Sequence, residues 1–291
     1  MSGSTFISWE AAVQWLREQP AQAALVQAAY YDDPLLAASQ RYARSEEWDE
    51  IRRWLSGRGG QVLDVGAGRG IASYALAREG FDVTALEPDS SDLVGAGAIR
   101  SLAREAGLPI RVVEEFSERL PFADNSFDVV FARAVLHHTS DLAAAAREFF
   151  RVLKPGGMLL ALREHVISQK TDLSAFLEAH PLHRLYGGEH AYSLQEYTTA
   201  LRSAGFKFRR PIGPLDSPVN YFPQTRMSLR SAIAERAGKI PGAGALMRTL
   251  LASDAALSLV LRLSSLVDRR PGRLYSFLCD KPGSNRLGEP R

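Results

Sequence analysis

The chain of 291 residues has little cysteine, little net charge and no long apolar run. Cys279 is its single cysteine, so no disulfide can form within the chain, and a reducing compartment fits this composition. The formal net charge of +2 is too small for the concentrated basic surface that nucleic-acid binding requires. We therefore expect no nucleic-acid partner.

Two further absences concern membranes and export. The most apolar stretch, 255–267, is interrupted by Arg262 and falls short of the roughly 20 apolar residues that a membrane-spanning helix needs. Residues 1–7 are polar and lack the apolar core of a secretion signal. We expect a soluble, cytoplasmic protein, and the sequence leaves its oligomeric state open.

Hydrophobic patterns divide the chain into four parts. Residues 1–60 have helical spacing throughout and predict a helical cap. In residues 61–210, short apolar runs alternate with helical patterns, which is typical of βαβ units and a parallel sheet. Residues 211–272 are far longer than an ordinary connection and predict a helical insertion that serves as a lid, wall or docking surface. Residues 273–291 predict a last core strand and a polar tail.

The same patterns give expected boundaries for the elements. The strands are expected at 61–65, 81–86, 110–113, 127–131, 158–162, 206–210 and 273–279. The helices after the cap are expected at 70–79, 92–106, 141–153 (capped by Ser140), 171–179 and 194–204 (capped by Ser193). Within the cap, residues 35–55 are expected to form one helical run. Residues 181–192, in the core part of the chain, are expected to form a loop.

Three glycines follow the first strand, at Gly66, Gly68 and Gly70. Glycine there lets the backbone turn tightly and lets a ligand approach the main chain. A dinucleotide fingerprint would place its third glycine one residue later, where this sequence has Ile71. Asp64 stands just before the loop, and an anion there opposes a pyrophosphate but suits a cationic amino group. The pattern therefore favours S-adenosylmethionine, which carries an ammonium and a sulfonium and no phosphate.

A second acidic residue ends the second strand. Glu87 lies 21 residues after Gly66, where a carboxylate can accept hydrogen bonds from both ribose hydroxyls. A dinucleotide enzyme would also need this acid, so Glu87 alone does not discriminate between the two cofactors.

Five ordered segments resemble the class I S-adenosylmethionine-dependent methyltransferases, in particular their small-molecule branch. These segments are 62–70, 86–89, 120–130, 135–138 and 153–157. The resemblance implies S-adenosylmethionine as the cofactor. It also implies an α/β fold, with a Rossmann-like, seven-stranded, mostly parallel sheet in the order 3-2-1-4-5-7-6 and helices on both faces.

The resemblance also implies roles for individual residues. The glycine loop would contact the methionine part through its backbone, Asp64 would hold the ammonium, and Glu87 the ribose. Arg133 would contact the methionine part by main chain, and His138 would lie near the methyl group. The full expected cofactor set is Asp64, Gly66, Ala67, Gly68, Gly70, Glu87, Pro88, Glu115, Phe116, Ser117, Arg133 and His138.

One segment departs from the family pattern. Ahead of the Leu-Pro-Phe stretch, the family usually has Gly-Asp-Ala, whose aspartate reads the adenine amino group. This chain has Glu115, Phe116 and Ser117 there. Phe116 cannot accept that hydrogen bond but can stack on adenine, and Glu115 can substitute if the loop shifts by one residue.

Candidate acid–base residues follow the fourth and fifth strands, at the sheet edge where open α/β sheets bind ligands. A base is needed only if the acceptor is a protonated nucleophile such as a hydroxyl. The expected catalytic residues are His138, Glu164 and His165. His137 is expected either to contact the acceptor or to pack as a structural residue.

Tyrosines are the other acceptor-binding candidates. Tyr30 and Tyr31 lie in the cap, where they either line the acceptor pocket or belong to the core, and Tyr186 lies in the 181–192 segment. That segment and its border also hold His180, His183, Glu189 and His190, whose spacing fits no standard metal motif. We therefore expect no metal.

The predicted function is methyl transfer from S-adenosylmethionine to a small-molecule acceptor, with an oxygen nucleophile as the first choice. One alternative is a lipid- or quinone-directed enzyme whose 255–267 helix docks on a membrane surface. Another is a non-catalytic, S-adenosylmethionine-binding regulator. A nicotinamide dehydrogenase ranks last.

Overall fold

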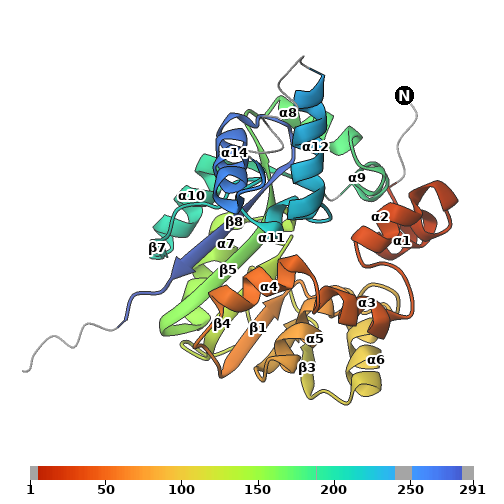
Figure 1. Cartoon of the computed structure of the whole chain (residues 1–291). Helices are drawn as coiled ribbons and strands as arrows, with labels where there is room; N and C mark the ends of the chain where they lie inside the picture. Colours follow the sequence, from red (N-terminus) through yellow and green to blue (C-terminus); the bar gives the residue numbers. More distant parts are fainter. Residues whose placement is uncertain (1–5, 188, 240–250, 284–291) are drawn as a thin grey trace, which may run out of the picture.

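A single mixed sheet with helices on both faces organises the chain (Figure 1). The computed structural model describes residues 6–187, 189–239 and 251–283. In this part of the chain the sheet has eight strands: seven follow the path β3-β2-β1-β4-β5-β8-β7, and the eighth, β6, pairs with β5 off this path. The strands are β1 (Gln61–Val65), β2 (Asp82–Leu86), β3 (Ile110–Val113), β4 (Phe127–Arg133), β5 (Leu153–Ile167), β6 (Tyr192–Ser193), β7 (Lys207–Phe208) and β8 (Arg273–Asp280).

The predicted strand order is confirmed. Strands β7 and β8 are the predicted sixth and seventh strands, and β8 runs antiparallel to both of its neighbours while the other pairs are parallel. Two features differ from expectation. The two-residue β6 adds a strand, and β5 is much longer than 158–162 because β8 pairs with it along most of its length.

The helices cover both faces of the sheet. Helices α7 and α10 pack on one face, and α3, α4, α5 and α11 pack on the other. Their bounds are α1 (Trp9–Arg17), η1 (Pro20–Gln22), α2 (Ala23–Ala28), α3 (Leu35–Tyr42), α4 (Glu46–Trp54), α5 (Ile71–Arg78), α6 (Ala96–Ala106), η2 (Leu136–His138), α7 (Leu142–Val152), α8 (Asp172–Glu178), α9 (Pro181–Tyr186), α10 (Leu194–Ser203), α11 (Pro218–Tyr221), α12 (Arg226–Gly238) and α14 (Asp254–Val267).

Local hydrogen bonds correct three expected boundaries. The run 35–55 splits into α3 and α4, because the Ser45 side chain caps α4 by accepting from the backbone N–H of Trp48. Asp141, not Ser140, caps α7, since its carboxylate accepts from Ala144. The expected loop 181–192 contains α9, which begins at Pro181, a favourable first helical residue.

The N-terminal helices contact segments on both sides of the edge at which the parallel strands end. Apolar side chains of α1 and α2 pack against Val94, ahead of α6, and against Leu182 of α9. Helix α4 is joined to the end of β4 by a buried ion pair, in which Arg133 contacts both carboxylate oxygens of Glu47 at 2.6 and 3.0 Å. The cap is therefore positioned to enclose that edge.

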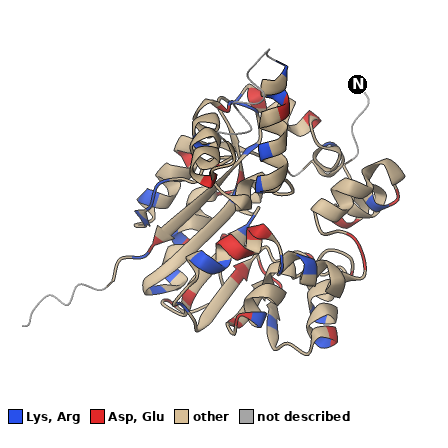
Figure 2. Ribbon diagram, in the orientation of Figure 1, with Lys and Arg blue, Asp and Glu red and all other residues tan. Residues whose placement is uncertain are grey.

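The expected insertion forms its own small core. Apolar residues of α11, α12 and α14 pack together around Tyr221, Leu229, Leu257 and Leu261. Residues 240–250 of the insertion and 284–291 of the expected tail lie outside the described residues. Lys and Arg positions are interspersed with Asp and Glu positions along the ribbon (Figure 2). Within the described residues, no helix has both the length and the apolar character that crossing a membrane requires.

Candidate active site

The glycine loop between β1 and α5 exposes its main chain. Gly66, Gly68 and Gly70 all have positive φ, at 58°, 55° and 83°. A Cβ on Gly66 would lie 2.8 Å from a methyl of Val135, so only glycine fits this close approach. At Gly68 the nearest atom to such a Cβ is the Val94 carbonyl oxygen, 3.9 Å away, so the main chain there stays open to a ligand.

Two buried carboxylates flank this loop. Asp64 lies in β1 and is buried, and its carboxylate accepts a 2.5 Å hydrogen bond from the Ser73 hydroxyl. Burial raises the pKa of this carboxyl to about 7. Glu87 accepts from the backbone N–H of Gly68 at 2.7 Å and of Asp89 at 3.0 Å, and burial also raises its pKa. Each Glu87 oxygen has a lone pair left for a hydroxyl donor.

Arg69 connects the loop to the cap, and its role was not predicted. Its buried guanidinium donates to the carbonyl oxygens of Tyr30 and Asp32, at 3.1 and 3.0 Å, and to the carboxylate of Asp33 at 2.5 Å. These bonds hold the segment between α2 and α3 over the loop. The sequence offered no signal for this contact, because Arg69 is an unremarkable residue inside the glycine motif.

Glu164 has a structural position that argues against its expected catalytic role. It is fully buried, and its carboxylate accepts from the backbone N–H groups of Val135, Leu136 and His137, each at 3.1 Å. It also accepts from Nδ1 of His137 at 2.7 Å. A register shift between Ala161 and Glu164 in β5 aims the side chain at the loop after β4. Glu164 therefore shapes that loop, and we do not retain it as a base.

The histidines gather beside this loop. His137 is buried, and burial lowers its pKa to about 3, so the ring is neutral at neutral pH. Its ring lies 4.3 Å from that of His138 and 4.7 Å from that of His165, centroid to centroid. Nδ1 of His165 lies 2.9 Å from the carbonyl oxygen of Gly272, which leaves Nε2 as its acceptor nitrogen.

Trp9 of the cap contacts His138 and joins it to aromatic side chains of the cap and of α9. The ring of Trp9 lies 6.2 Å from His138, 6.4 Å from Tyr31 and 5.2 Å from Tyr186. Nothing in the local sequence around Trp9 predicts this contact. Tyr31 and Tyr186 are both partly exposed, and their place beside the acceptor stays a prediction.

Tyr30 belongs instead to the core. It is 1% exposed, stacks on Phe222 at 5.6 Å and meets Tyr42 edge-on at 5.3 Å. Burial raises its pKa to about 12. The sequence left two roles open for Tyr30, acceptor binding and core packing. Its burial and ring contacts favour core packing, so we do not propose it as an acceptor-binding residue.

The segment expected near adenine follows β3. Phe116 is 68% exposed, and Glu115 is exposed beside it. Ser117 is buried, and its hydroxyl donates to Glu118 at 3.1 Å. Both Phe116 and Glu115 are thus accessible to an adenine, and the stacking and hydrogen-bonding alternatives remain distinct predictions.

The loop suits a cationic, phosphate-free ligand. Among the described residues, neither Asp64 nor Glu87 has a basic ion-pair partner, although both are buried. A pyrophosphate would have to enter against these two carboxylates. An ammonium and a pair of ribose hydroxyls would instead find the acceptors they need.

Known proteins resemble the chain over this part of the fold. A family model described as a methyltransferase domain matches residues 63–161. O-methyltransferase resE of Aspergillus sclerotiorum is 32% identical over 193 residues, which are 64% of this chain and 69% of that protein. Phosphoethanolamine N-methyltransferase 1 of Arabidopsis thaliana is 33% identical over 149 residues, 51% of this chain and 29% of that protein. The chain therefore spans under a third of the plant protein's length.

A solved structure extends the likeness to nearly the whole chain. Geranyl diphosphate C-methyltransferase from Streptomyces coelicolor A3(2) superposes with a TM-score of 0.56, covering 94% of this chain and 97% of that one at 15% identity. At that identity the likeness concerns the fold alone. The names of these three proteins include O-, N- and C-directed methyl transfer, so similarity does not select the acceptor atom.

Proposed function

The chain belongs to the class I S-adenosylmethionine-dependent methyltransferases, and from that premise we propose that it methylates a hydroxyl group of a small-molecule acceptor. S-adenosylmethionine, the cofactor of this family, supplies a methyl carbon already activated by its sulfonium. The tasks left for the protein are to align the acceptor, to exclude water and, for a hydroxyl, to accept a proton.

The observation that carries the proposal is the position of His138. It follows β4 at the carboxyl edge of the sheet, next to the glycine loop, and Trp9 covers it from the cap. A hydroxyl between His138 and the aromatic residues would find a hydrogen-bond acceptor in the imidazole and apolar walls in Trp9, Tyr31 and Tyr186. His165 is the proposed second acceptor nitrogen.

Turnover with defined acceptors tests this proposal. The purified chain is incubated with S-adenosylmethionine and a panel of phenols, aliphatic alcohols and amines, and S-adenosylhomocysteine and methylated products are measured by mass spectrometry. We expect products from hydroxyl acceptors, and a His138→Asn variant that keeps its cofactor affinity but loses about 100-fold in kcat. Products from amines alone would overturn the oxygen assignment. Cofactor binding without product from any acceptor would favour the regulator.

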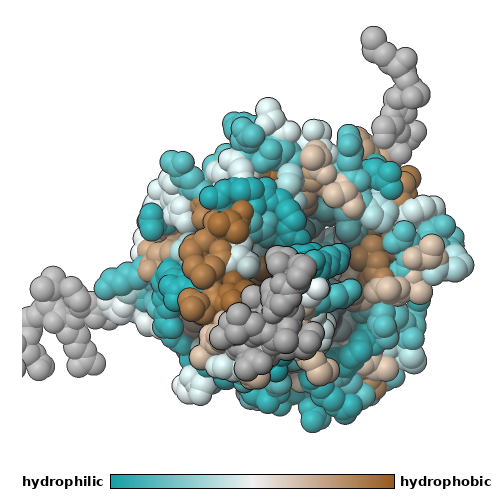
Figure 3. Space-filling model, turned by 45° about the horizontal axis from the view of Figure 1, so that its top comes forward, coloured by the Kyte–Doolittle hydropathy of each residue, from teal (hydrophilic) through white to brown (hydrophobic). Residues whose placement is uncertain are grey.

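A second candidate is a lipid- or quinone-directed enzyme that works at a membrane surface. Four apolar residues of α14 are strongly exposed, namely Leu259, Leu263, Leu266 and Val267. They recur at helical spacing, and a hydrophobic patch is visible over this end of the molecule (Figure 3). Such a face can insert into the boundary between headgroups and acyl chains.

Vesicle flotation separates the two candidates. The membrane proposal expects the chain to float with anionic phosphatidylglycerol vesicles, and a Leu259→Ser/Leu263→Ser/Leu266→Ser variant to remain in solution. Met227→Ser, which changes an exposed apolar residue on α12, is the matched control. Absence of the wild-type chain from the floating fraction would remove this candidate.

A further inference from the structure

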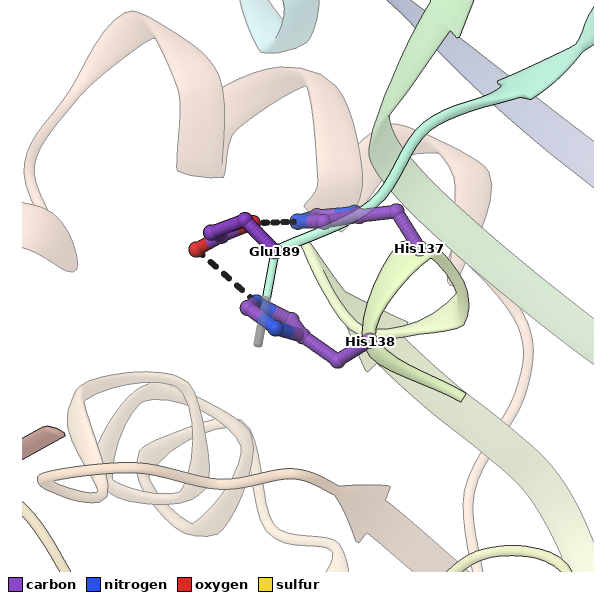
Figure 4. Close-up of side chains that lie close together, drawn as sticks. All are labelled: His137, His138 and Glu189. Carbon is purple, nitrogen blue, oxygen red and sulfur yellow. Dashed lines mark ion pairs between the residues drawn. The ribbon is translucent and has the colours of Figure 1, made fainter. Parts of the chain in front are cut away.

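Three ligand-type side chains from two distant segments meet beside the loop after β4. His137 and His138 belong to η2, and Glu189 lies between α9 and β6 (Figure 4). Nε2 of His137 lies 3.8 Å from Oε2 of Glu189, and Nε2 of His138 lies 3.7 Å from Oε1. The three candidate ligand atoms all lie within 4.8 Å of one another. His137 and Glu189 are buried, while His138 is partly exposed.

The proton on His137 is placed by Glu164. Three backbone N–H groups donate to Glu164, which favours its ionised, acceptor-only form. Nδ1 of His137, 2.7 Å from Oε2, is therefore assigned the hydrogen, and Nε2 presents a lone pair. A carboxylate that orients a histidine through its second nitrogen is the usual outer partner of a metal-bound imidazole. Three backbone N–H groups in turn hold Glu164, so the ring is fixed in this orientation.

Glu189 has an unsatisfied oxygen that faces this lone pair. Its Oε2 is buried and has no hydrogen-bond partner among the described residues. A buried polar atom left unpaired is destabilising, because it has lost its hydrogen bonds to water and gained none. The 3.8 Å separation from Nε2 of His137 is too long for a hydrogen bond that would share a proton. Nε2 of His137 and Oε2 of Glu189 thus present lone pairs to each other away from water, and a cation between the two atoms would stabilise this arrangement.

We propose that His137, His138 and Glu189 bind a divalent transition-metal ion, with zinc as the probe that fits best. Two imidazoles and one carboxylate match the ligands of zinc sites that keep a position open, whereas magnesium and calcium prefer oxygen ligands. Bonds of about 2.0–2.2 Å in tetrahedral geometry place ligand atoms roughly 3.4 Å apart. The two nitrogen–oxygen distances, one to each oxygen of Glu189, are within about half an ångström of that value. The three ligand atoms lie within 4.8 Å of one another, and the partly exposed His138 ring has room to bring them to the closer spacing.

The open position would face the acceptor. Trp9 lies against His138, so the remaining coordination side is directed toward the aromatic residues of the cap and α9. This part of the inference rests on the proposed function: an oxygen of the acceptor, or a water in its absence, would complete the coordination. Because Nε2 of His138 would then hold the ion, Nε2 of His165 would accept the hydroxyl proton in its place. The ion would then fix the acceptor's position relative to the glycine loop.

Zinc titration of the full chain tests the site without any turnover. After dialysis against EDTA, isothermal titration calorimetry with zinc chloride should show one equivalent bound with micromolar affinity or tighter. Glu189→Gln and His137→Asn should each weaken binding by at least 30-fold. The control variants His190→Asn and His180→Asn, which change neighbouring histidines outside the three ligands, should bind like the wild type.

Two further measurements keep the result interpretable. Thermal melts should show that zinc raises the melting temperature of the wild-type chain and of both controls, but not of Glu189→Gln. Cobalt(II) substitution should give visible absorption bands that the Glu189→Gln variant lacks. No zinc uptake, or equal uptake by Glu189→Gln and His190→Asn, would overturn the proposal.

The outcomes also separate this inference from the proposed function. Hydroxyl methylation by the EDTA-treated chain, with no zinc uptake, would reject the metal site and leave the function standing. Zinc uptake that depends on Glu189, with no methylated product from any hydroxyl, would support the site and reject the function.

Discussion

The two halves of the candidate site differ in how their polar groups are satisfied. On the cofactor side, Glu87 already accepts from Gly68 and Asp89, and Asp64 accepts from Ser73, all within the βαβ unit. On the acceptor side, the histidines of η2 meet Glu189, whose Oε2 has no partner among the described residues. The first half is formed by the local fold, whereas the second is assembled from distant segments, and we propose that a bound ion completes it.

Removing Glu164 should give the largest effect, because the acceptor side depends on it. Glu164→Ala leaves three backbone N–H groups and Nδ1 of His137 without their acceptor. We expect the free energy of unfolding, measured by urea denaturation, to fall by about 5 kcal/mol. Glu164→Gln keeps an acceptor oxygen and should cost about 1–2 kcal/mol. A loss below about 1 kcal/mol for the alanine variant would contradict this role.

The pH dependence of Asp64 tests the cofactor side. Burial raises its pKa in the folded chain to about 7, from 3.8, so folding favours the protonated form. Its contribution to stability is therefore complete below about pH 4 and is lost as the pH rises through about 7. At 1.36 kcal/mol per unit, the wild type should lose about 4 kcal/mol relative to Asp64→Asn between pH 4 and pH 8, without cofactor. A pH-independent difference between the two unfolding curves would refute it.

Glu87 should contribute most to cofactor affinity. Glu87→Gln replaces a charged acceptor of the ribose hydroxyls, each of whose hydrogen bonds contributes about 1.5–3 kcal/mol. We expect calorimetry to show S-adenosylmethionine binding weakened about 100-fold. Glu115→Gln is the matched control: unchanged affinity would support adenine stacking on Phe116, whereas a loss comparable to that of Glu87→Gln would favour the hydrogen-bonding alternative.

Trp9 should affect the acceptor side alone. Trp9→Leu removes the aromatic contacts with His138, Tyr31 and Tyr186, and an aromatic pair contributes about 0.5–1.5 kcal/mol. We expect KM for the acceptor to rise about 10-fold with no change in cofactor affinity. Trp15→Leu, on the same helix but outside this cluster, should leave both quantities unchanged. If Trp9→Leu weakened cofactor binding and acceptor binding equally, the cofactor side and the acceptor side of the site would not be separable.

Predictions from the sequence were confirmed where the structure depends on residues close together in the chain. The strands β1 and β3 have the expected bounds, α6 ends at Ala106 as expected, and the expected N-cap Ser193 forms a capping box with Glu196. The glycine loop and Glu87 lie at consecutive points of one βαβ unit, so their spacing was readable. The Glu47–Arg133 ion pair and the contact of Arg69 with the cap join residues 86 and 36–39 positions apart, and no local pattern marks them.

The sequence alone determined the alternation of strands and helices and the position of the glycine loop, because apolar periodicity and glycine act over a few residues. The order of the sheet was implied by the resemblance to the methyltransferase family. Only the tertiary structure decided that Glu164 supports a loop instead of acting as a base, that Tyr30 is core, and that Glu189 meets His137 and His138. The bulge in β5 and the packing of α1 on α9 set those positions, and both depend on partners far along the chain. The sequence shows only that a residue is an aspartate or glutamate. Whether its carboxylate faces solvent, a group of backbone donors or a cation depends on tertiary packing.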